Sequence, residues 1–315
     1  MGALSTPVVL AVSGGIDSMV LADALHRREP SMLAAIATFD HGTGPAARAA
    51  AALVTDWGAA RGITVHAGRA EPALAPTEAA WRRTRWAFLT DVGRRCSAPV
   101  ATAHTADDQV ETVFMRLVRG SGVRGLAGLL APSRIARPLL AHSREEVCEL
   151  AARHAVPFLE DPSNSDLRHL RNRVRLELLP ALERAEPGFR AWLLDLGRRA
   201  AEWRRDVADA VDACWQPAVA TVAGVVVVPR NRRRLPKLDE AALFWPEVAG
   251  RVGVALDRRG TARLASFTTR SVTNQRIPLS GGAVVTSRRD AWRLERTGAG
   301  GAGCGPSERW APREG

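Results

Sequence analysis

Short apolar segments alternate with amphipathic segments over the first 120 residues. The apolar segments predict strands over residues 7–13, 32–42, 63–68 and 98–105. The segments between them carry apolar residues at helical spacing and predict helices over residues 18–28, 45–62, 76–96 and 106–120. Strands that alternate with helices are typical of an α/β fold with a parallel sheet and helices on both faces.

The pattern changes after residue 120. Residues 120–140 are rich in glycine, arginine and proline, which predicts a loop-rich connection. Further helices are predicted over residues 143–156, where Ser143 and Glu146 form a capping box, over a basic segment within 160–182, and over 189–214. From about residue 218 the pattern indicates short strands, with a hairpin at Gly281-Gly282.

These elements predict two domains. We expect an α/β catalytic domain over residues 1–187, a linker helix over 188–217, a smaller α+β domain over 218–296 and a disordered tail over 297–315. We see no internal repeat that would indicate a solenoid.

Charge is the unusual feature of the composition. The chain has 44 basic and 33 acidic residues, a net charge of +11, and Lys237 is its only lysine. An arginine-rich surplus favours a polyanionic partner, nucleic acid first, because the planar guanidinium binds phosphate with two hydrogen bonds. A bias toward arginine and alanine in the genome is an equally good explanation of the same numbers.

Cysteine spacing and hydropathy predict a cytoplasmic protein. The four cysteines lie far apart and no pair has the CxxC spacing of a metal, iron–sulfur or redox site. Free thiols are typical of a reducing compartment. No apolar run approaches the roughly 20 residues that a membrane-spanning helix needs, so we expect no membrane partner.

Three polar clusters follow predicted strands at their carboxyl ends. They comprise Ser13–Ser18, Asp40–His41 and His104–Asp108. In open parallel sheets the ligand binds at this edge. Three clusters at one edge indicate a site more strongly than any one of them does.

The first cluster reads SGGIDS and indicates an anion-binding loop. Two glycines let the backbone approach a ligand, and amides at the start of a helix favour an anion. The predicted binding residues are Ser13, Gly14, Gly15, Ile16, Asp17 and Ser18. A Walker-type loop would carry a lysine near its end, and this one has none.

The second cluster, AHTADDQVET, crowds acids at a helix start. Asp108 and Glu111 are i,i+3 neighbours on one helix face, and His104 precedes them. Like charges that lie close together favour a cation, and the spacing leaves a metal ion and an ammonium group both open. Asp107 fits the ordinary preference of acids for helix starts.

The basic segment RHLRNRVR, residues 168–175, holds four arginines and a histidine. A helix distributes them around its surface, as suits a track of phosphates. A solvated charged face is the alternative. The runs RLVRGSGVRG and RNRRR extend the basic character to other segments.

The order of these motifs resembles the tRNA(Ile)-lysidine synthase family of PP-loop ATP pyrophosphatases. The motifs are SGGIDS, FDHG, AWRRTRW, AHTADDQVETVFMRLVRGSGVRGLAGL, RPLL and EDPSNSDLRHLRNRVRLELLPAL, within residues 7–190. The resemblance implies an adenine nucleotide alpha hydrolase-like domain. It also implies a ligase that adenylates C2–O of wobble cytidine 34 in a tRNA(Ile) with anticodon CAU, releases pyrophosphate, and joins L-lysine to C2 with loss of AMP. Decoding and charging then change from methionine to isoleucine.

The resemblance also implies roles for individual residues. Asp40, His104, Asp108 and Glu111 are expected to be catalytic, and His104, Asp108, Glu111 and Arg85 to bind lysine. Arg82, Arg119, Arg124, Arg171, Asn172, Arg173 and Arg175 are expected to bind tRNA. ATP is expected as substrate and Mg²⁺ as cofactor, with Asp17 as the metal-binding residue. A homodimer is left open.

Three positions depart from the family pattern. Thr105 stands where a second histidine is common, Thr43-Gly44-Pro45 replaces Leu-Arg-Pro, and Trp86 replaces a tyrosine after Arg85. None lies in SGGIDS or among the acids, so we expect an active enzyme.

Three other functions fit parts of the sequence. A tRNA cytidine thiolase would need paired CxxC motifs. An NAD synthetase-type amidotransfer enzyme would leave the basic segments unused. A non-catalytic RNA-binding protein would not need an intact SGGIDS loop together with an intact HTADDQVE segment.

Overall fold

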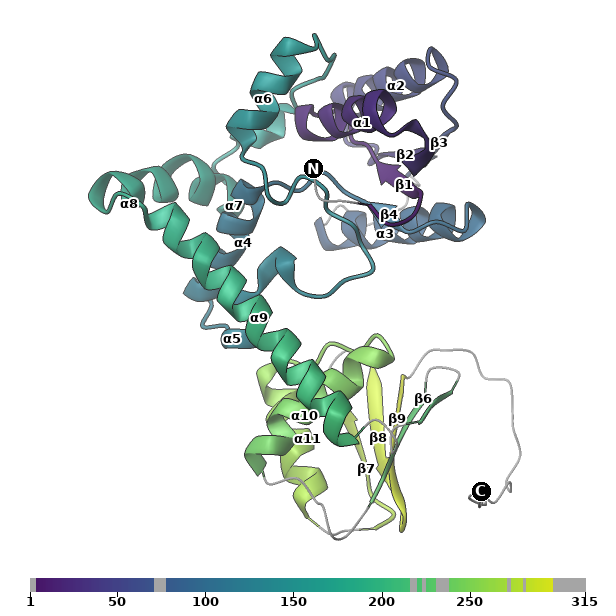
Figure 1. The fold of residues 1–315 in the computed structure, drawn as a ribbon, viewed down its shortest axis with the longest axis vertical. Coiled ribbons are helices and arrows are strands. Elements are labelled where there is room, and N and C mark those ends of the chain that lie inside the picture. Colours follow the sequence, from purple (N-terminus) through teal and green to yellow (C-terminus); the bar gives the residue numbers. More distant parts are fainter. Residues whose placement is uncertain are drawn as a thin grey trace. The chain divides into compact units, whose positions relative to one another are not determined.

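The computed structural model describes residues 4–70, 78–215, 220–222, 225–230, 238–270, 273–279 and 282–296. The chain divides into two compact units, Met1–Trp203 and Arg204–Gly315 (Figure 1). The predicted tail over 297–315 lies outside the described residues.

The first unit is built on a four-stranded parallel sheet with strand order β3-β2-β1-β4. Its strands are β1 (Val8–Ala11), β2 (Leu33–Asp40), β3 (Val65–Arg69) and β4 (Val100–Ala101). The central strand β1 is almost fully buried, as expected for a strand with helices on both faces. The parallel sheet predicted from the alternating pattern is confirmed.

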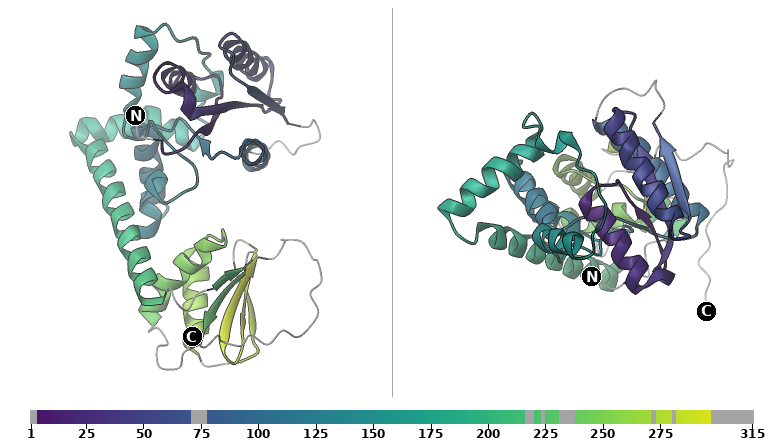
Figure 2. Two further views of the ribbon diagram at one scale, coloured as in Figure 1. Left: turned by 45° about the vertical axis from the view of Figure 1, so that its right-hand side comes forward. Right: turned by 90° about the horizontal axis from the view of Figure 1, so that it is seen from above.

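Helices cover both faces of this sheet. The elements that follow β1 to β4 are α1 (Ile16–Arg28), the 3₁₀ turn η1 (Pro30–Met32), α2 (Pro45–Ala59), α3 (Glu78–Arg95) and α4 (Ala106–Val118). Side chains of α1 and α2 share one core with Leu10 and Ile36, whereas Leu89 and Val92 of α3 share another with Val9. Figure 2 (left) shows α3 end-on, across the strands from α1 and α2.

Strand β4 is much shorter than the predicted strand over 98–105. Ala136 bridges Ala101, accepts from the amide of Thr102 at 2.9 Å and donates to Val100 O at 2.9 Å. The loop-rich segment 120–140 thus completes the sheet edge. The polar residues after Thr102 leave the strand to begin α4.

The rest of the first unit is helical. It contains α5 (Val123–Leu126), the 3₁₀ turn η2 (Gly128–Leu130), α6 (Arg144–Arg153), the 3₁₀ turn η3 (Pro162–Ser165), α7 (Leu170–Arg173), the π-helical turn η4 (Val174–Leu178), α8 (Leu179–Ala185) and α9 (Phe189–Trp215). The π turn ends two residues before Pro180, which has no amide hydrogen to donate within a helix. The predicted linker helix is α9, and the boundary between the units falls inside it.

The second unit is an antiparallel sheet packed against two helices. The sheet has strand order β5-β6-β9-β8-β7, with β5 (Ala220–Val222), β6 (Val225–Pro229), β7 (Arg276–Leu279), β8 (Ala283–Ser287) and β9 (Ala291–Arg296). The helices are α10 (Leu238–Arg251) and α11 (Arg258–Thr269). Trp245 and Trp292 are fully buried and meet edge-to-face, with ring centroids 5.9 Å apart. The predicted α+β character is confirmed.

Candidate active site

The SGGIDS loop is held in shape by its two serines. The buried Ser18 hydroxyl accepts a hydrogen bond from the amide of Ser13 at 3.1 Å and donates to Gly15 O at 2.9 Å. The first bond of α1 runs from Met19 N to Gly15 O, so the preceding amides have no acceptor within the helix. Gly14 O accepts from the amide of Leu159, which ties the segment after α6 to the loop. The loop is therefore preorganised as an anion-binding helix start.

Asp17, in the first turn of α1, pairs with an arginine that the sequence did not single out. Its Oδ2 accepts from Arg144 Nη1 at 2.7 Å, whereas its Oδ1 is buried and has no hydrogen-bond partner. Burial raises the pKa of Asp17, and the charge of Arg144 opposes that shift. An unpartnered buried carboxylate oxygen is a fitting ligand for a hard cation such as Mg²⁺. Within the described ranges, the Asp17 position included, no three acid, histidine or cysteine side chains gather in a way that could hold a metal ion.

Helix α4 starts with a capping box at the end of β4. Thr105 is its N-cap, and the Asp108 carboxylate accepts a hydrogen bond from the amide of Thr105 at 2.9 Å. The fully buried Gln109 donates to Ala127 O at 3.1 Å and accepts from Leu129 N at 2.6 Å. Thr105 and Gln109 therefore fix the start of the helix that carries the predicted acids.

The two predicted acids are joined to two arginines of the basic segment. Arg171 donates to Asp108 Oδ1 and to Glu111 Oε2, both at 2.6 Å. Arg175 donates to Glu111 Oε1 at 2.5 Å. The Glu111 side chain is only 2% exposed, so burying its charge requires these partners. The acids and the basic segment, predicted as two separate clusters, form one four-membered network.

His104 lies next to this network as a neutral imidazole. Its Nδ1 is 2.8 Å from the Thr102 hydroxyl. Burial lowers the pKa of His104 to about 4, and Arg137, Arg171 and Arg85 add to the shift against the opposing charge of Asp108. His104 is therefore uncharged at neutral pH, and the same lowered pKa makes it a weak proton acceptor.

Arg85 and His41 each bury a nitrogen that has no hydrogen-bond partner. These atoms are Nε of Arg85 and Nδ1 of His41. Burial lowers the pKa of His41, and the nearby charge of Arg85 lowers it further. The His41 ring lies near the rings of Phe39 and Trp81, with centroids 5.2 and 6.4 Å away. Buried polar atoms without a protein partner, next to aromatic rings, are typical of a site that binds a polar ligand.

Asp40 ends β2 as a buried carboxylate. Its Oδ1 accepts from the amide of Gly42 at 2.7 Å, and its Oδ2 is 3.4 Å from Arg69 Nε. It therefore stabilises the turn after β2, whatever else it contacts.

The predicted tRNA-binding residues fall into two groups. Arg171 and Arg175 face the acids, and Asn172 donates to the carbonyls of Ser163 and Asp166, which fixes the turn before α7. The exposed members of the set are Arg82, Arg119 and Arg173, and Arg124 is half-buried.

Asp107 has structural partners. It accepts from the backbone amide of Arg144 at 2.8 Å and from Arg190 Nη1 at 3.0 Å. Sequence reasoning missed Arg144 and Arg190 because both lie far along the chain from the acids. One signal was present for Arg144: a cation is the first residue of helix α6, where the helix dipole disfavours positive charge.

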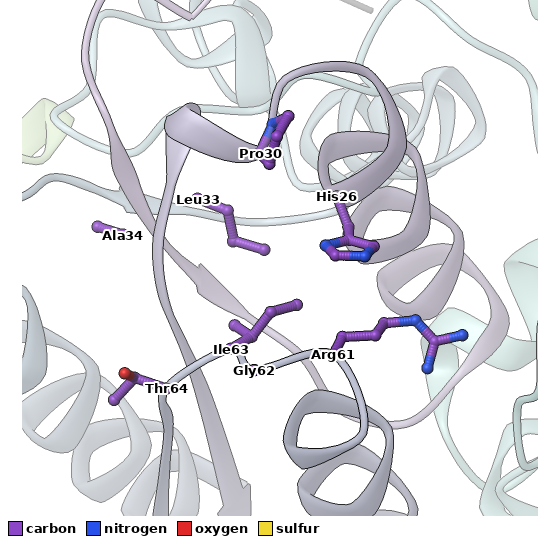
Figure 3. Close-up of a pocket in the computed structure, with 8 residues that line it drawn as sticks. All are labelled: His26, Pro30, Leu33, Ala34, Arg61, Gly62, Ile63 and Thr64. Atoms are coloured by element: carbon purple, nitrogen blue, oxygen red, sulfur yellow. The ribbon is translucent and has the colours of Figure 1, made fainter.

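Two cavities lie apart from these residues. One of about 260 Å³ is lined by residues including His26, Pro30 and Arg61 (Figure 3), and Arg61 already stacks over Trp57 at 4.2 Å. The other, of about 510 Å³, lies between α1 and α6. Neither is lined by the loop or the acids.

A parallel sheet with a glycine-rich anion loop after its first strand is typical of nucleotide-binding α/β proteins. A family model described as the PP-loop domain matches residues 4–182. A U34-tRNA thiolase from Methanococcus maripaludis has a similar fold, with a TM-score of 0.53 at 18% identity, over 63% of this chain and 72% of that chain.

Similar sequences are tRNA(Ile)-lysidine synthases. The chain is 35% identical to that of Streptomyces coelicolor, over 93% of this chain and 86% of the relative, and 30% identical to that of Parasynechococcus marenigrum, over 93% and 87%. It is 41% identical to that of Salinispora tropica over 57% of each chain, so this match spans little more than half of the relative. The chain belongs to the tRNA(Ile)-lysidine synthase family of PP-loop ATP pyrophosphatases.

No helix in the described part of the chain is long and apolar enough to span a bilayer.

Proposed function

We propose that this protein is a ligase that modifies tRNA(Ile) with anticodon CAU. It joins the ε-amine of L-lysine to C2 of cytidine 34 through an adenylated cytidine, and converts ATP to AMP and pyrophosphate. The product decodes and is charged as an isoleucine tRNA instead of a methionine tRNA. The protein acts in the cytoplasm.

One observation carries the proposal: the anion loop and the acid network belong to one site. Arg144 joins them, because its guanidinium donates to Asp17 Oδ2 of the loop at 2.7 Å and its amide donates to Asp107 Oδ2, in the first turn of the helix that carries Asp108, at 2.8 Å. A nucleotide bound by the loop would therefore have its reacting phosphate near groups that suit a cationic amino acid.

In the first step the cytosine O2 attacks the α-phosphate, and pyrophosphate leaves. The helix-start amides and the serines of the loop bind the departing pyrophosphate. Asp17 would hold Mg²⁺ through its unpartnered Oδ1, and the ion would neutralise phosphate charge. Asp40 acts near the reacting nucleotide.

In the second step the lysine amine displaces AMP. Asp108 and Glu111 bind lysine as an ammonium ion, and Arg85 binds its carboxylate through a guanidinium whose buried Nε awaits an acceptor. The ε-amine must lose a proton before it attacks C2. In this proposal one of the three neighbouring groups, His104, Asp108 or Glu111, accepts that proton.

The tRNA binds along the basic surface of the first unit. Arg173, Arg82 and Arg119 are exposed and suit direct phosphate contacts. Arg171, Asn172 and Arg175 connect this surface to the acids, and Arg124 extends it beyond α4. The second unit recognises other parts of the tRNA.

Arg173→Ala is expected to weaken tRNA binding and to reduce its salt dependence. Each lost phosphate contact lowers the slope of log K against log salt by about 0.7–0.9. Binding of the tRNA transcript at a series of salt concentrations measures both effects. Arg168→Ala is the matched control, because Arg168 is committed to Asp166 through three hydrogen bonds. An unaltered slope for Arg173→Ala would make this helix a solvated charged face.

Label transfer tests the proposed function directly. The full chain is incubated with ATP, Mg²⁺, radiolabelled lysine and a tRNA(Ile) transcript with anticodon CAU. We expect label in this tRNA and none in a methionine tRNA with the same anticodon. Absence of label with folded protein would refute the proposal, and label in both tRNAs would refute the specificity.

A further inference from the structure

The anion loop lacks a cation of its own. Lysine is absent from the first unit, since Lys237 is the only lysine in the chain. A leaving pyrophosphate nevertheless accumulates negative charge that a cation stabilises. We propose that Arg144 supplies this cation: its guanidinium binds the pyrophosphate part of the nucleotide, as a further catalytic residue. This inference rests on the proposed function.

Arg144 is already placed at the loop. Its Nη1 is 2.7 Å from Asp17 Oδ2, and Asp17 lies in the first turn of α1, where the anion-binding amides are. The backbone of Arg144 is fixed as well, because its amide donates to Asp107 Oδ2 at 2.8 Å. Ser143 and Glu146 close a capping box around the same helix start. The guanidinium therefore extends from a rigid position.

Among the arginines of the described part of the chain that pair with acids of this site, Arg144 is the one whose ion pair lies in the anion loop. The side chains of Arg171 and Arg175 bond Glu111 and Asp108, and Arg190 bonds Asp107. The Arg144 side chain is 39% exposed and makes a single ion pair, with Asp17. Its remaining N–H groups are free to donate to phosphate oxygens, which a guanidinium binds in pairs.

The position is also unusual for an arginine. A cation in the first turn of a helix is disfavoured by the helix dipole. The two residues that follow, Glu145 and Glu146, have the ordinary charge for that turn. An anionic ligand beside Arg144 would offset this cost, as Asp17 does in part.

The first chemical step forms one P–O bond and breaks another. The bond from cytosine O2 to Pα forms, and the bond from Pα to the bridging oxygen of the β-phosphate breaks. The electron pair of the broken bond stays on pyrophosphate, where the guanidinium donates hydrogen bonds to it. Arg144 keeps its bond to the Asp17 carboxylate and donates to the pyrophosphate through its remaining N–H groups.

Binding of inorganic pyrophosphate to the full chain tests the role of Arg144. Calorimetry is done with EDTA and again with Mg²⁺. Arg144→Ala is expected to weaken binding about 10- to 100-fold in both conditions, and Arg144→Lys to retain part of it. Arg153→Ala, the same charge change in the last turn of the same helix, is expected to bind as the wild type does. Equal binding by Arg144→Ala and wild type would overturn the inference.

A second pair of variants separates direct binding from support of Asp17. Asp17→Asn removes the ion pair and leaves the guanidinium, so we expect pyrophosphate to bind in EDTA at least as tightly as to wild type. Weakening equal to that of Arg144→Ala would mean that Arg144 acts only through Asp17. The double variant Asp17→Asn/Arg144→Ala has no unpaired carboxylate to destabilise the fold. It is expected to keep the wild-type unfolding midpoint and still bind weakly, and wild-type affinity in this variant would overturn the inference.

Failure of the proposed function gives a different result. If the wild type bound pyrophosphate through Arg144 but transferred no lysine to tRNA, the assigned reaction would be wrong and the phosphate contact would stand. If the wild type bound no pyrophosphate at all, both would fall.

Discussion

Asp108→Asn is expected to abolish lysine transfer while tRNA binding is retained. The carboxylate provides one of the two charges for the lysine ammonium, and its Oδ1 also accepts from Arg171 at 2.6 Å. An amide group at this position has no charge and can turn a donor toward the guanidinium. Removing one partner of a hydrogen-bonded charge pair between protein and ligand costs about 2–5 kcal/mol of binding free energy, which corresponds to a loss of roughly 10–10³-fold in lysine transfer.

Separate assays of the two half-reactions locate this defect. Pyrophosphate release that depends on tRNA, measured without lysine, is expected to continue in Asp108→Asn, whereas labelled lysine no longer enters the tRNA. Asp91→Asn is the matched control, because Asp91 is a half-exposed acid on α3 paired with Arg94 and Arg95. It is expected to retain both activities. Lysine transfer at the wild-type rate in Asp108→Asn would remove Asp108 from the mechanism.

The parallel sheet could be predicted because its signals are local. Each strand is a short apolar run and each helix has its own periodicity and caps, so the order of elements follows from neighbouring residues. Helix α10 was missed, although Ala241, Phe244, Trp245 and Val248 have helical spacing. Pro246 lies inside this helix, where a proline is unfavourable, and burial of the two neighbouring aromatic residues in the core outweighs that local preference.

The site could be predicted only in its separate parts. The loop and the acids follow strands, so their shared edge follows from topology. Ion pairs between distant segments do not follow from it: Arg171 is 60 residues from Glu111, and Arg144 is 127 residues from Asp17. Sequence spacing predicted a cation for the acids but could not show that the chain itself supplies two guanidiniums.

The guanidiniums of Arg171 and Arg175 mean that the two acids do not form an unpaired cation-binding site. A free carboxylate pair would attract any cation, whereas Asp108 and Glu111 are already satisfied by Arg171 and Arg175. Lysine must therefore share or replace existing bonds, and its binding energy is the difference between two sets of contacts. Arg171 and Arg175 belong to the segment that we propose for tRNA binding, so the proposal brings both substrates to the same four side chains.

Gly14→Ala is expected to destabilise the first unit and to remove pyrophosphate binding. Gly14 has φ +85°, and a Cβ there would lie 2.9 Å from both Cβ and O of Ala50. A left-handed backbone costs an L-residue about 1–2 kcal/mol, and the contact with α2 adds to it. Because Gly14 O also accepts from the amide of Leu159, relief of the clash would move the loop away from the segment after α6.

Alanine variants of two other glycines separate the cost of a left-handed backbone from the cost of the steric clash with Ala50. Gly188→Ala places an alanine at φ +94° with nothing within 4 Å, so it carries the backbone strain alone. Gly15 has φ −79°, and a Cβ there would meet only Ser13 Oγ at 3.6 Å, so Gly15→Ala carries neither. The urea unfolding midpoint is expected to be highest for Gly15→Ala, lower for Gly188→Ala and lowest for Gly14→Ala. Calorimetry is expected to find pyrophosphate binding lost in Gly14→Ala and kept in Gly188→Ala. If Gly14→Ala had the same urea midpoint and the same pyrophosphate affinity as Gly188→Ala, helix α2 would be able to shift to accommodate the new methyl group. The close approach of the loop to Ala50 would then not be required for anion binding.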